Sequence, residues 1–184
     1  MSDFFKCTAC GRMVKEIYEG RGELSCCGRA MIQLGEFKSV DELLAYAIEK
    51  EVEAREFYLE WAGKLATPHL QEVFRSFAAE EDKHREKLER VKAGSLFRPS
   101  ARPITDLRIV DYLVDLVPTP GMDYQEALII AMKREKASFR LYNDLSQLAT
   151  DESLKATFLA LAQEEAKHKL RLETEYETDI YGEN

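Results

Sequence analysis

The chain has 184 residues, enough for one ordinary domain or for one domain with a small module. Its formal net charge of −8 argues against a nucleic-acid partner, because such proteins normally present a basic face. It has no run of about 18 apolar residues that would predict a membrane span. No secretory signal is evident at the N-terminal end either, so we expect a cytoplasmic protein with no membrane partner.

The first 37 residues are predicted to form a small β-rich module, with a β-like stretch at Met13–Tyr18. A module of this size cannot bury enough apolar surface to fold on that basis alone, so we expect a bound metal to stabilise it. Four thiolates favour tetrahedral iron or zinc, whereas disulfide bonds, the alternative, are disfavoured in a reducing cytoplasm. The candidate ligands are the only four cysteines of the chain: Cys7, Cys10, Cys26 and Cys27.

Residues 38–184 show the hydrophobic periodicity of amphipathic helices. Ser39 is a candidate N-cap for the first helix, and Thr67-Pro68 separates that helix from the second. Gly94 is a stop signal for the second helix.

A long connection over residues 94–122 follows, and we expect a short helix in it near Asp106–Leu116. The third and fourth helices are expected to begin near Asp123 and Asp151. Two helix pairs joined by one long crossover predict a mainly α, ferritin-like four-helix bundle preceded by the β-rich module.

The two predicted helix pairs match each other without a gap when the chain is shifted by 84 residues. Glu51 then falls on Glu135, and the Glu-x-x-His motif of the second helix falls on that of the fourth. Two of the three histidines are in register, which generic helix composition would not readily produce. The third, His69, has no counterpart, and we interpret it as a surface residue near a helix start.

These acidic residues interrupt apolar stripes, where an ionised carboxylate is costly unless it is paired or bound to metal. Residues i and i+3 share one helix face, so each Glu-x-x-His motif presents an oxygen and a nitrogen to one metal. Surface salt bridges are the alternative for any single glutamate. The duplicated set instead predicts a two-metal centre of iron, with manganese or zinc as alternatives. Its ligands are Glu51, Glu81, His84, Glu135, Glu165 and His168.

Tyr58 and Tyr142 lie two helical turns after Glu51 and Glu135. They are candidate catalytic residues that hydrogen-bond a ligand carboxylate, and ordinary core tyrosines are the alternative.

Two families are similar to parts of this sequence. Residues 4–34 resemble desulforedoxin and the N-terminal module of desulfoferrodoxin, through Phe5-Lys6-Cys7, Cys10-Gly11 and Glu19–Gly28. This resemblance implies one iron held by the four cysteines in an electron-transfer role. Residues 39–177 resemble the rubrerythrin branch of the ferritin-like superfamily, through the duplicated glutamates, tyrosines and Glu-Glu-x-x-His motifs.

The rubrerythrin resemblance implies that Glu81 and Glu165 bridge two irons and that Glu51 and Glu135 are terminal ligands. It also implies peroxide reduction fed by electrons from a thiolate-bound iron. Two features depart from the usual pattern. The cysteine module is N-terminal and desulforedoxin-like, and Ser138 stands where an additional glutamate ligand is common.

The leading functional hypothesis is a peroxidase that takes hydrogen peroxide, or dioxygen, as its oxidant and receives electrons from a donor protein. The alternatives are a ferroxidase or iron-handling protein, and a non-enzymatic electron-transfer metalloprotein. A homodimer is expected, because the small module has little surface of its own to bury.

Overall fold

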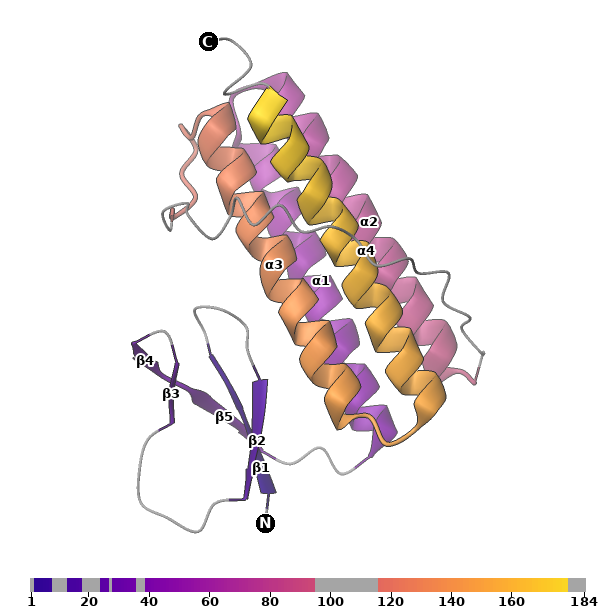
Figure 1. The fold of residues 1–184 in the computed structure, drawn as a ribbon. Helices are drawn as coiled ribbons and strands as arrows, with labels where there is room; N and C mark the ends of the chain where they lie inside the picture. The colour runs from indigo at the N-terminus through magenta and orange to yellow at the C-terminus, as the bar shows by residue number, and fades with distance from the viewer. Residues whose placement is uncertain are drawn as a thin grey trace.

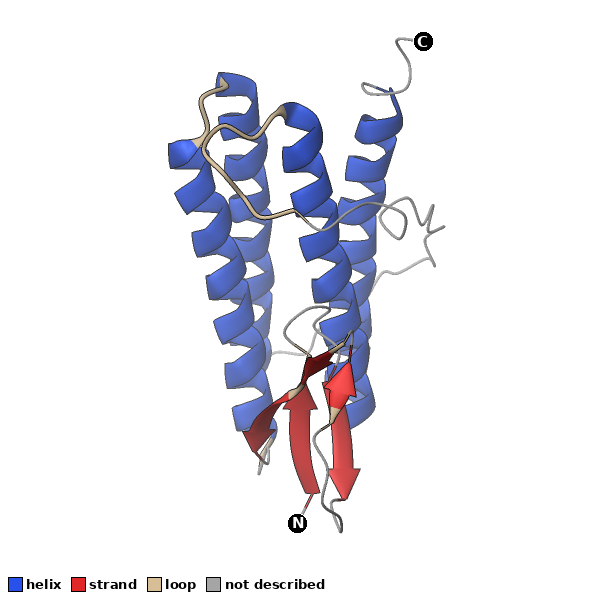
Figure 2. Cartoon of the chain, turned by 90° about the vertical axis from the view of Figure 1, so that its left-hand side faces the viewer, coloured by secondary structure: helices blue, strands red, loops and turns tan. Residues whose placement is uncertain are grey.

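The structure is a computed structural model that describes residues 2–7, 13–17, 24–26, 28–35, 39–94 and 116–178. It confirms the predicted fold, a ferritin-like four-helix bundle preceded by a small β module (Figures 1 and 2). The predicted boundary between residues 37 and 38 lies outside the described residues, as does all but the last residue of the expected helix near Asp106–Leu116. Leu116 itself is not helical.

The module contains a three-stranded antiparallel sheet in the order β2-β1-β5 and a separate two-stranded pair, β3-β4. The strands are β1 (Ser2–Lys6), β2 (Met13–Ile17), β3 (Ser25–Cys26), β4 (Arg29–Ala30) and β5 (Ile32–Gly35). The predicted β-like stretch therefore forms β2, apart from Tyr18, which lies outside the described residues. The module lies beside the bundle, near the end where the first helix begins (Figures 1 and 2).

The bundle consists of two antiparallel helix pairs. Its helices are α1 (Val40–Lys64), α2 (Pro68–Lys92), α3 (Tyr124–Leu148) and α4 (Glu152–Tyr176). None of the helices in the described ranges is long and apolar enough to cross a membrane.

The helix starts follow the capping signals of the sequence. Ser39 accepts a hydrogen bond from the backbone of Glu42, and Asp123 forms a full capping box with Glu126. Asp151 likewise caps α4 through the backbone of Leu154. These caps satisfy backbone N–H groups that a helix end leaves without partners, so they fix where each helix begins.

Two apolar clusters fill the bundle interior. One contains Tyr58, Phe74, Phe77 and Met132, and the other contains Leu44, Leu88, Tyr142 and Phe158. His69 lies outside both and is exposed at the start of α2, as its lack of a repeat counterpart suggested.

Candidate metal centre

Six polar side chains converge inside the bundle, and each helix contributes at least one of them. α1 and α3 each contribute one carboxylate, whereas α2 and α4 each contribute a carboxylate and an imidazole three positions apart. They are the residues that the duplicated motif selects: Glu51, Glu81, His84, Glu135, Glu165 and His168. All are buried except His168, whose side chain is 16% exposed.

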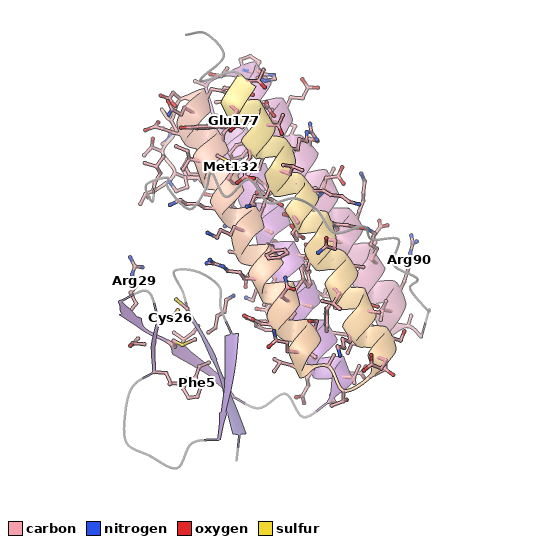
Figure 3. All side chains as sticks on the ribbon, viewed as in Figure 1. Phe5, Cys26, Arg29, Arg90, Met132 and Glu177 are labelled. Atoms are coloured by element: carbon pink, nitrogen blue, oxygen red, sulfur yellow. The ribbon has the colours of Figure 1, made fainter. Side chains whose placement is uncertain are left out.

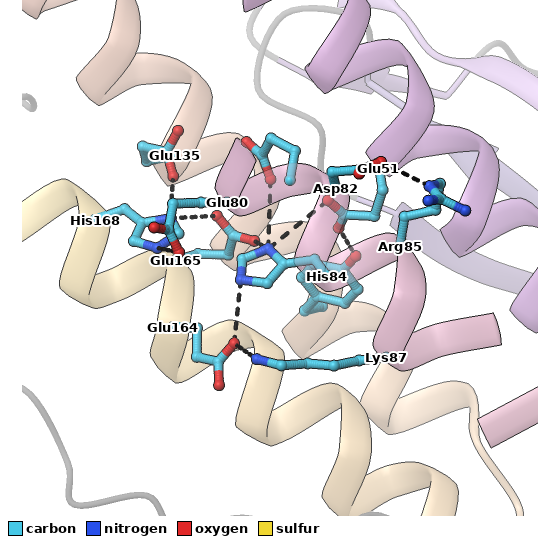
Figure 4. A network of polar contacts seen from close by, with 12 residues as sticks. Glu51, Glu80, Asp82, His84, Arg85, Lys87, Glu135, Glu164, Glu165 and His168 are labelled. Atoms are coloured by element: carbon cyan, nitrogen blue, oxygen red, sulfur yellow. Dashed lines mark hydrogen bonds and ion pairs between the residues drawn. The ribbon is translucent and has the colours of Figure 1, made fainter. Parts of the chain in front are cut away.

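The six residues form two groups whose ligand atoms lie within 4.8 Å of one another. The first group contains Glu51, Glu81, His84 and Glu165, and the second contains Glu135, Glu165 and His168. Glu165 is common to both, which suits a bridging carboxylate, whereas Glu81 belongs to the first group alone. The two imidazole rings are stacked with their centroids 5.3 Å apart (Figure 4). That these residues hold metal stays a prediction, but their arrangement suits two neighbouring ions.

Several buried atoms of this centre have no hydrogen-bond partner among the described residues. They are one oxygen each of Glu51 and Glu81 and Oε2 of Glu165, whereas Oε1 of Glu165 lies 2.9 Å from Nδ1 of His84. Buried polar atoms without partners are costly, so their convergence at one place needs an explanation. Cations satisfy carboxylate oxygens and imidazole nitrogens together, and this mixture of donors suits iron or manganese.

Burial and mutual repulsion change the proton affinities of the carboxylates. Burial raises the pKa of Glu51 and of Glu165 well above the usual range, and the charge of Glu81 adds to the effect on both. Burial alone would also raise the pKa of Glu135, but hydrogen bonding from Nδ1 of His168, at 3.2 Å, is among the contacts that lower it. Without cations the centre therefore retains protons that bound metal would displace.

Each tyrosine hydrogen-bonds a carboxylate that belongs to the other helix pair. Tyr58 donates to Oε1 of Glu135 at 2.6 Å, and Tyr142 donates to Oε1 of Glu51. Both tyrosines are fully buried. Their described hydroxyl contacts are thus with candidate ligands, a position from which they can orient a carboxylate. Their catalytic role stays a prediction.

Two further glutamates lie on the outer side of the imidazoles, and the sequence analysis did not assign them a role. Oε2 of Glu164 lies 3.1 Å from Nε2 of His84, while Oε2 of Glu80 lies 3.9 Å from Nε2 of His168 (Figure 4). Each comes from the helix opposite its histidine. The doubled glutamates of the two Glu-Glu-x-x-His motifs were the signal for these contacts.

The Glu164 contact is reinforced by Lys87, which forms an ion pair with the same carboxylate oxygen. Burial opposes ionisation of Glu164, but the bonds from His84 and Lys87 prevail and lower its pKa to about 2. Glu164 is therefore ionised at neutral pH and can hold Nε2 of His84 protonated, leaving Nδ1 to face the buried carboxylates.

The described part of the cysteine module brings two of its four candidate ligands together. Cys7 follows β1 and is fully buried, and its thiol donates to the backbone carbonyl of Cys26 at 3.5 Å. Gly28, with φ of +70°, occupies the turn between β3 and β4, a conformation that suits glycine. Cys10 and Cys27 lie outside the described residues, so the four-cysteine site stays a prediction.

A cleft of about 480 Å³ lies between the cysteine module and the bundle. Cys7 lines its module side and Glu81 of the candidate metal centre also lines it, together with residues of α1 and α3. Ser138, which stands where rubrerythrins commonly have another glutamate, is a lining residue as well. Figure 3 shows Cys26 on the module beside the bundle.

Comparisons with known proteins find two families that match different parts of the chain. The rubrerythrin family model matches residues 42–176, and the model for the N-terminal domain of desulfoferrodoxin matches residues 1–34. A hypothetical protein from Pyrococcus furiosus has a similar structure, with a TM-score of 0.51 and 27% identity. That similarity covers 77% of this chain and 90% of the Pyrococcus chain.

Two curated proteins are similar to the module alone. Desulforedoxin from Megalodesulfovibrio gigas is 48% identical over 31 residues, which are 17% of this chain and 84% of that protein. A desulfoferrodoxin homologue from Archaeoglobus fulgidus is 47% identical over 38 residues, 21% of this chain. This chain spans only 30% of the length of that homologue.

The helical match covers well over half of the sequence, and both matched families consist of iron-binding redox proteins. The chain is therefore a member of the rubrerythrin family that carries a desulfoferrodoxin-type N-terminal module.

Proposed function

We propose that this protein is a non-haem di-iron peroxidase that reduces hydrogen peroxide in oxidative-stress defence. The observation that carries the proposal is the convergence of buried, unsatisfied ligand atoms on two adjacent positions with Glu165 shared between them. Two iron ions bound there would supply two electrons and Lewis-acid activation for cleavage of the O–O bond.

The chain's own residues prepare the centre for this chemistry. Tyr58 and Tyr142 hold Glu135 and Glu51 through their hydroxyl groups, so these two carboxylates keep one orientation. Glu164 fixes the ring of His84 from the outer side. The apolar clusters of the bundle interior limit access of water to the centre.

The cysteine module is proposed to pass electrons to the bundle, and a separate donor protein is proposed to reduce the module. Cys7 and Glu81 line the same cleft, which supports transfer over a short path within one chain. Homodimer formation and a cytoplasmic location also remain proposals.

The test uses anaerobically purified, fully reduced protein mixed rapidly with hydrogen peroxide or with dioxygen. We expect peroxide to reoxidise the centre faster than dioxygen, over repeated turnovers when a reductant is present. Glu81→Gln should abolish this reoxidation, because Glu81 is a candidate ligand that lines the cleft. The matched control is Glu56→Gln on the exposed side of α1, which should leave the rate unchanged.

Faster reaction with dioxygen, accompanied by net iron uptake and little repeated turnover, would contradict the peroxidase proposal and favour a ferroxidase.

A further inference from the structure

The cleft between the module and the bundle has a charge opposite to that of the whole protein. Five cationic side chains line it: Lys6, Arg29, Lys50, Lys133 and Arg134. Two carboxylates are also among its lining residues, Glu53 and Glu81. Glu53 pairs with Lys50, which leaves four other cations, and Glu81 is only 2% exposed within the candidate metal centre. Since the chain has a net charge of −8, this concentration of cations is local.

Such an arrangement favours an anion in the cleft. The cations come from the module, from α1 and from α3, so folding brings like charges toward one cleft. A narrow cleft with one dominant sign of charge focuses the potential and raises the local concentration of ions of opposite sign. An anion bound there would relieve the repulsion among the cations and bridge the module to the bundle.

Among these cations, Arg134 has the side chain whose orientation best suits binding an anion. Its guanidinium lies over the ring of Phe57, 3.8 Å from the ring centroid. Its Nε is buried and has no hydrogen-bond partner among the described residues. Stacking fixes the plane of the guanidinium, and a fixed fork of N–H donors matches a carboxylate better than a flexible ammonium group does.

The cleft also has an apolar wall, formed by the partly exposed side chains of Phe57, Leu116 and Pro118 with the buried Ile130 and Leu141 behind them. A simple inorganic anion would leave this wall in contact with water. A ligand with a short hydrocarbon body and one acidic group would cover the wall and pair with the cations at once. The volume of about 480 Å³ lies within the range of small-molecule sites.

We propose that the cleft binds a small organic carboxylate, with its acidic group on Arg134 and its hydrocarbon body against the partly exposed side chains of Phe57, Leu116 and Pro118. This site lies beside Glu81 but uses none of the candidate metal ligands for recognition. It therefore goes beyond the proposed peroxidase function, and binding is measurable whether or not that function is correct.

The test is calorimetric titration of the full-length protein, with its metals as purified, using hexanoate as the probe. Two comparison ligands separate the contributions: hexan-1-ol has the hydrocarbon body without the charge, and inorganic phosphate has charge without the body. We expect saturable binding of hexanoate that weakens as salt is added. Hexan-1-ol and phosphate should each bind at least tenfold more weakly than hexanoate.

Arg134→Gln should weaken hexanoate binding by roughly tenfold, the usual effect of losing a charge-assisted hydrogen bond. Arg75→Gln is the matched control, because Arg75 is exposed on α2 outside the cleft and its described contact is with neutral Gln71. Arg75→Gln should leave the affinity unchanged.

Arg29→Gln is a second variant, to be used if Arg134→Gln does not fold. Arg29 is exposed on the module, so its substitution should not disturb folding (Figure 3). We expect it to weaken binding by roughly threefold, as for an exposed ion pair.

Absence of saturable hexanoate binding would overturn the proposal. So would equal affinity for phosphate, which would reveal a purely electrostatic anion site, or equal affinity for hexan-1-ol, which would reveal a purely apolar one. Equal effects of Arg134→Gln and Arg75→Gln would also overturn it.

Discussion

The two tyrosines at the candidate metal centre connect the two halves of the duplicated sequence. Tyr142 in α3 donates to Glu51 in α1, and Tyr58 in α1 donates to Glu135 in α3. The sequence placed each tyrosine two turns after a candidate ligand of its own helix. It could not reveal that the bonds cross between helices, because that depends on how α1 and α3 pack.

Replacement of either tyrosine by phenylalanine should loosen the carboxylate that it holds. We expect Tyr142→Phe and Tyr58→Phe each to lower the affinity of the bundle for ferrous iron by roughly tenfold or more. Tyr176→Phe is the matched control, because Tyr176 is also buried and its hydroxyl accepts a hydrogen bond from Gln125, away from the candidate ligands. Anaerobic iron titration measures the affinities, and an equal loss in all three variants would contradict a role at the centre.

The two outer glutamates provide a second comparison at the residue scale. Glu164 lies 3.1 Å from its imidazole nitrogen and also pairs with Lys87, whereas Glu80 lies 3.9 Å from its own. Glu164→Gln should therefore reduce iron affinity more than Glu80→Gln, with an effect of roughly tenfold. Competition between the protein and a coloured chelator gives both values. A larger effect of Glu80→Gln would show that the distance between glutamate and imidazole does not determine how much each glutamate contributes to iron affinity.

The raised pKa values of Glu51 and Glu165 predict how the stability of the metal-free protein depends on pH. A carboxyl whose folded-state pKa is raised stabilises the fold fully below its unfolded pKa, about 4.3. That contribution is lost as the pH rises through the raised folded value. Glu165→Gln cannot ionise, so it should remove part of this loss and stabilise the metal-free protein at pH 7 by about 1–3 kcal/mol.

Urea unfolding of the metal-free proteins between pH 4 and pH 8 measures this difference. Glu56→Gln, on the exposed side of α1, should follow the wild type throughout. A metal-free Glu165→Gln protein that is less stable than the wild type at pH 7 would refute the interpretation that the centre is strained without cations.

At the scale of elements, the sequence predicted the helices well because hydrogen bonds between residues close in sequence determine where three of them begin. Ser39, Asp123 and Asp151 each cap a helix through a bond to a backbone N–H three residues later, which is a short-range interaction. The Glu-x-x-His spacing is equally local. Contacts between helices, such as Glu164 with His84, required the structure because no spacing within one helix specifies them.

The caps differ in a way that can be measured. Asp123 makes both bonds of a capping box with Glu126, whereas Thr67 makes no side-chain cap bond at the start of α2. Asp123→Ala should lower the free energy of unfolding by about 1 kcal/mol, and Thr67→Ala by much less. Urea unfolding of both variants at pH 7 gives the comparison. Equal losses would mean that the capping box does not stabilise α3.

At the scale of the whole molecule, sequence and structure agree on a ferritin-like four-helix bundle preceded by a small β module. The cleft between them was not predicted, because it is lined by residues from the module, α1, α2, α3 and the crossover. Lys50 and Arg134 look like ordinary surface cations in the sequence. Helix packing brings them to the same cleft as Glu81, and the position of the module adds Cys7.

The central claim is that the duplicated glutamates and histidines hold two metal ions, separately from the cysteine module. Iron content and visible absorption of anaerobically reconstituted protein test it most directly, in the wild type and in Glu165→Ala, which removes the residue common to both ligand groups. We predict two bundle irons and one thiolate iron per wild-type chain. The variant should lose the bundle iron and keep the thiolate absorption. Unchanged iron content in Glu165→Ala would contradict the claim.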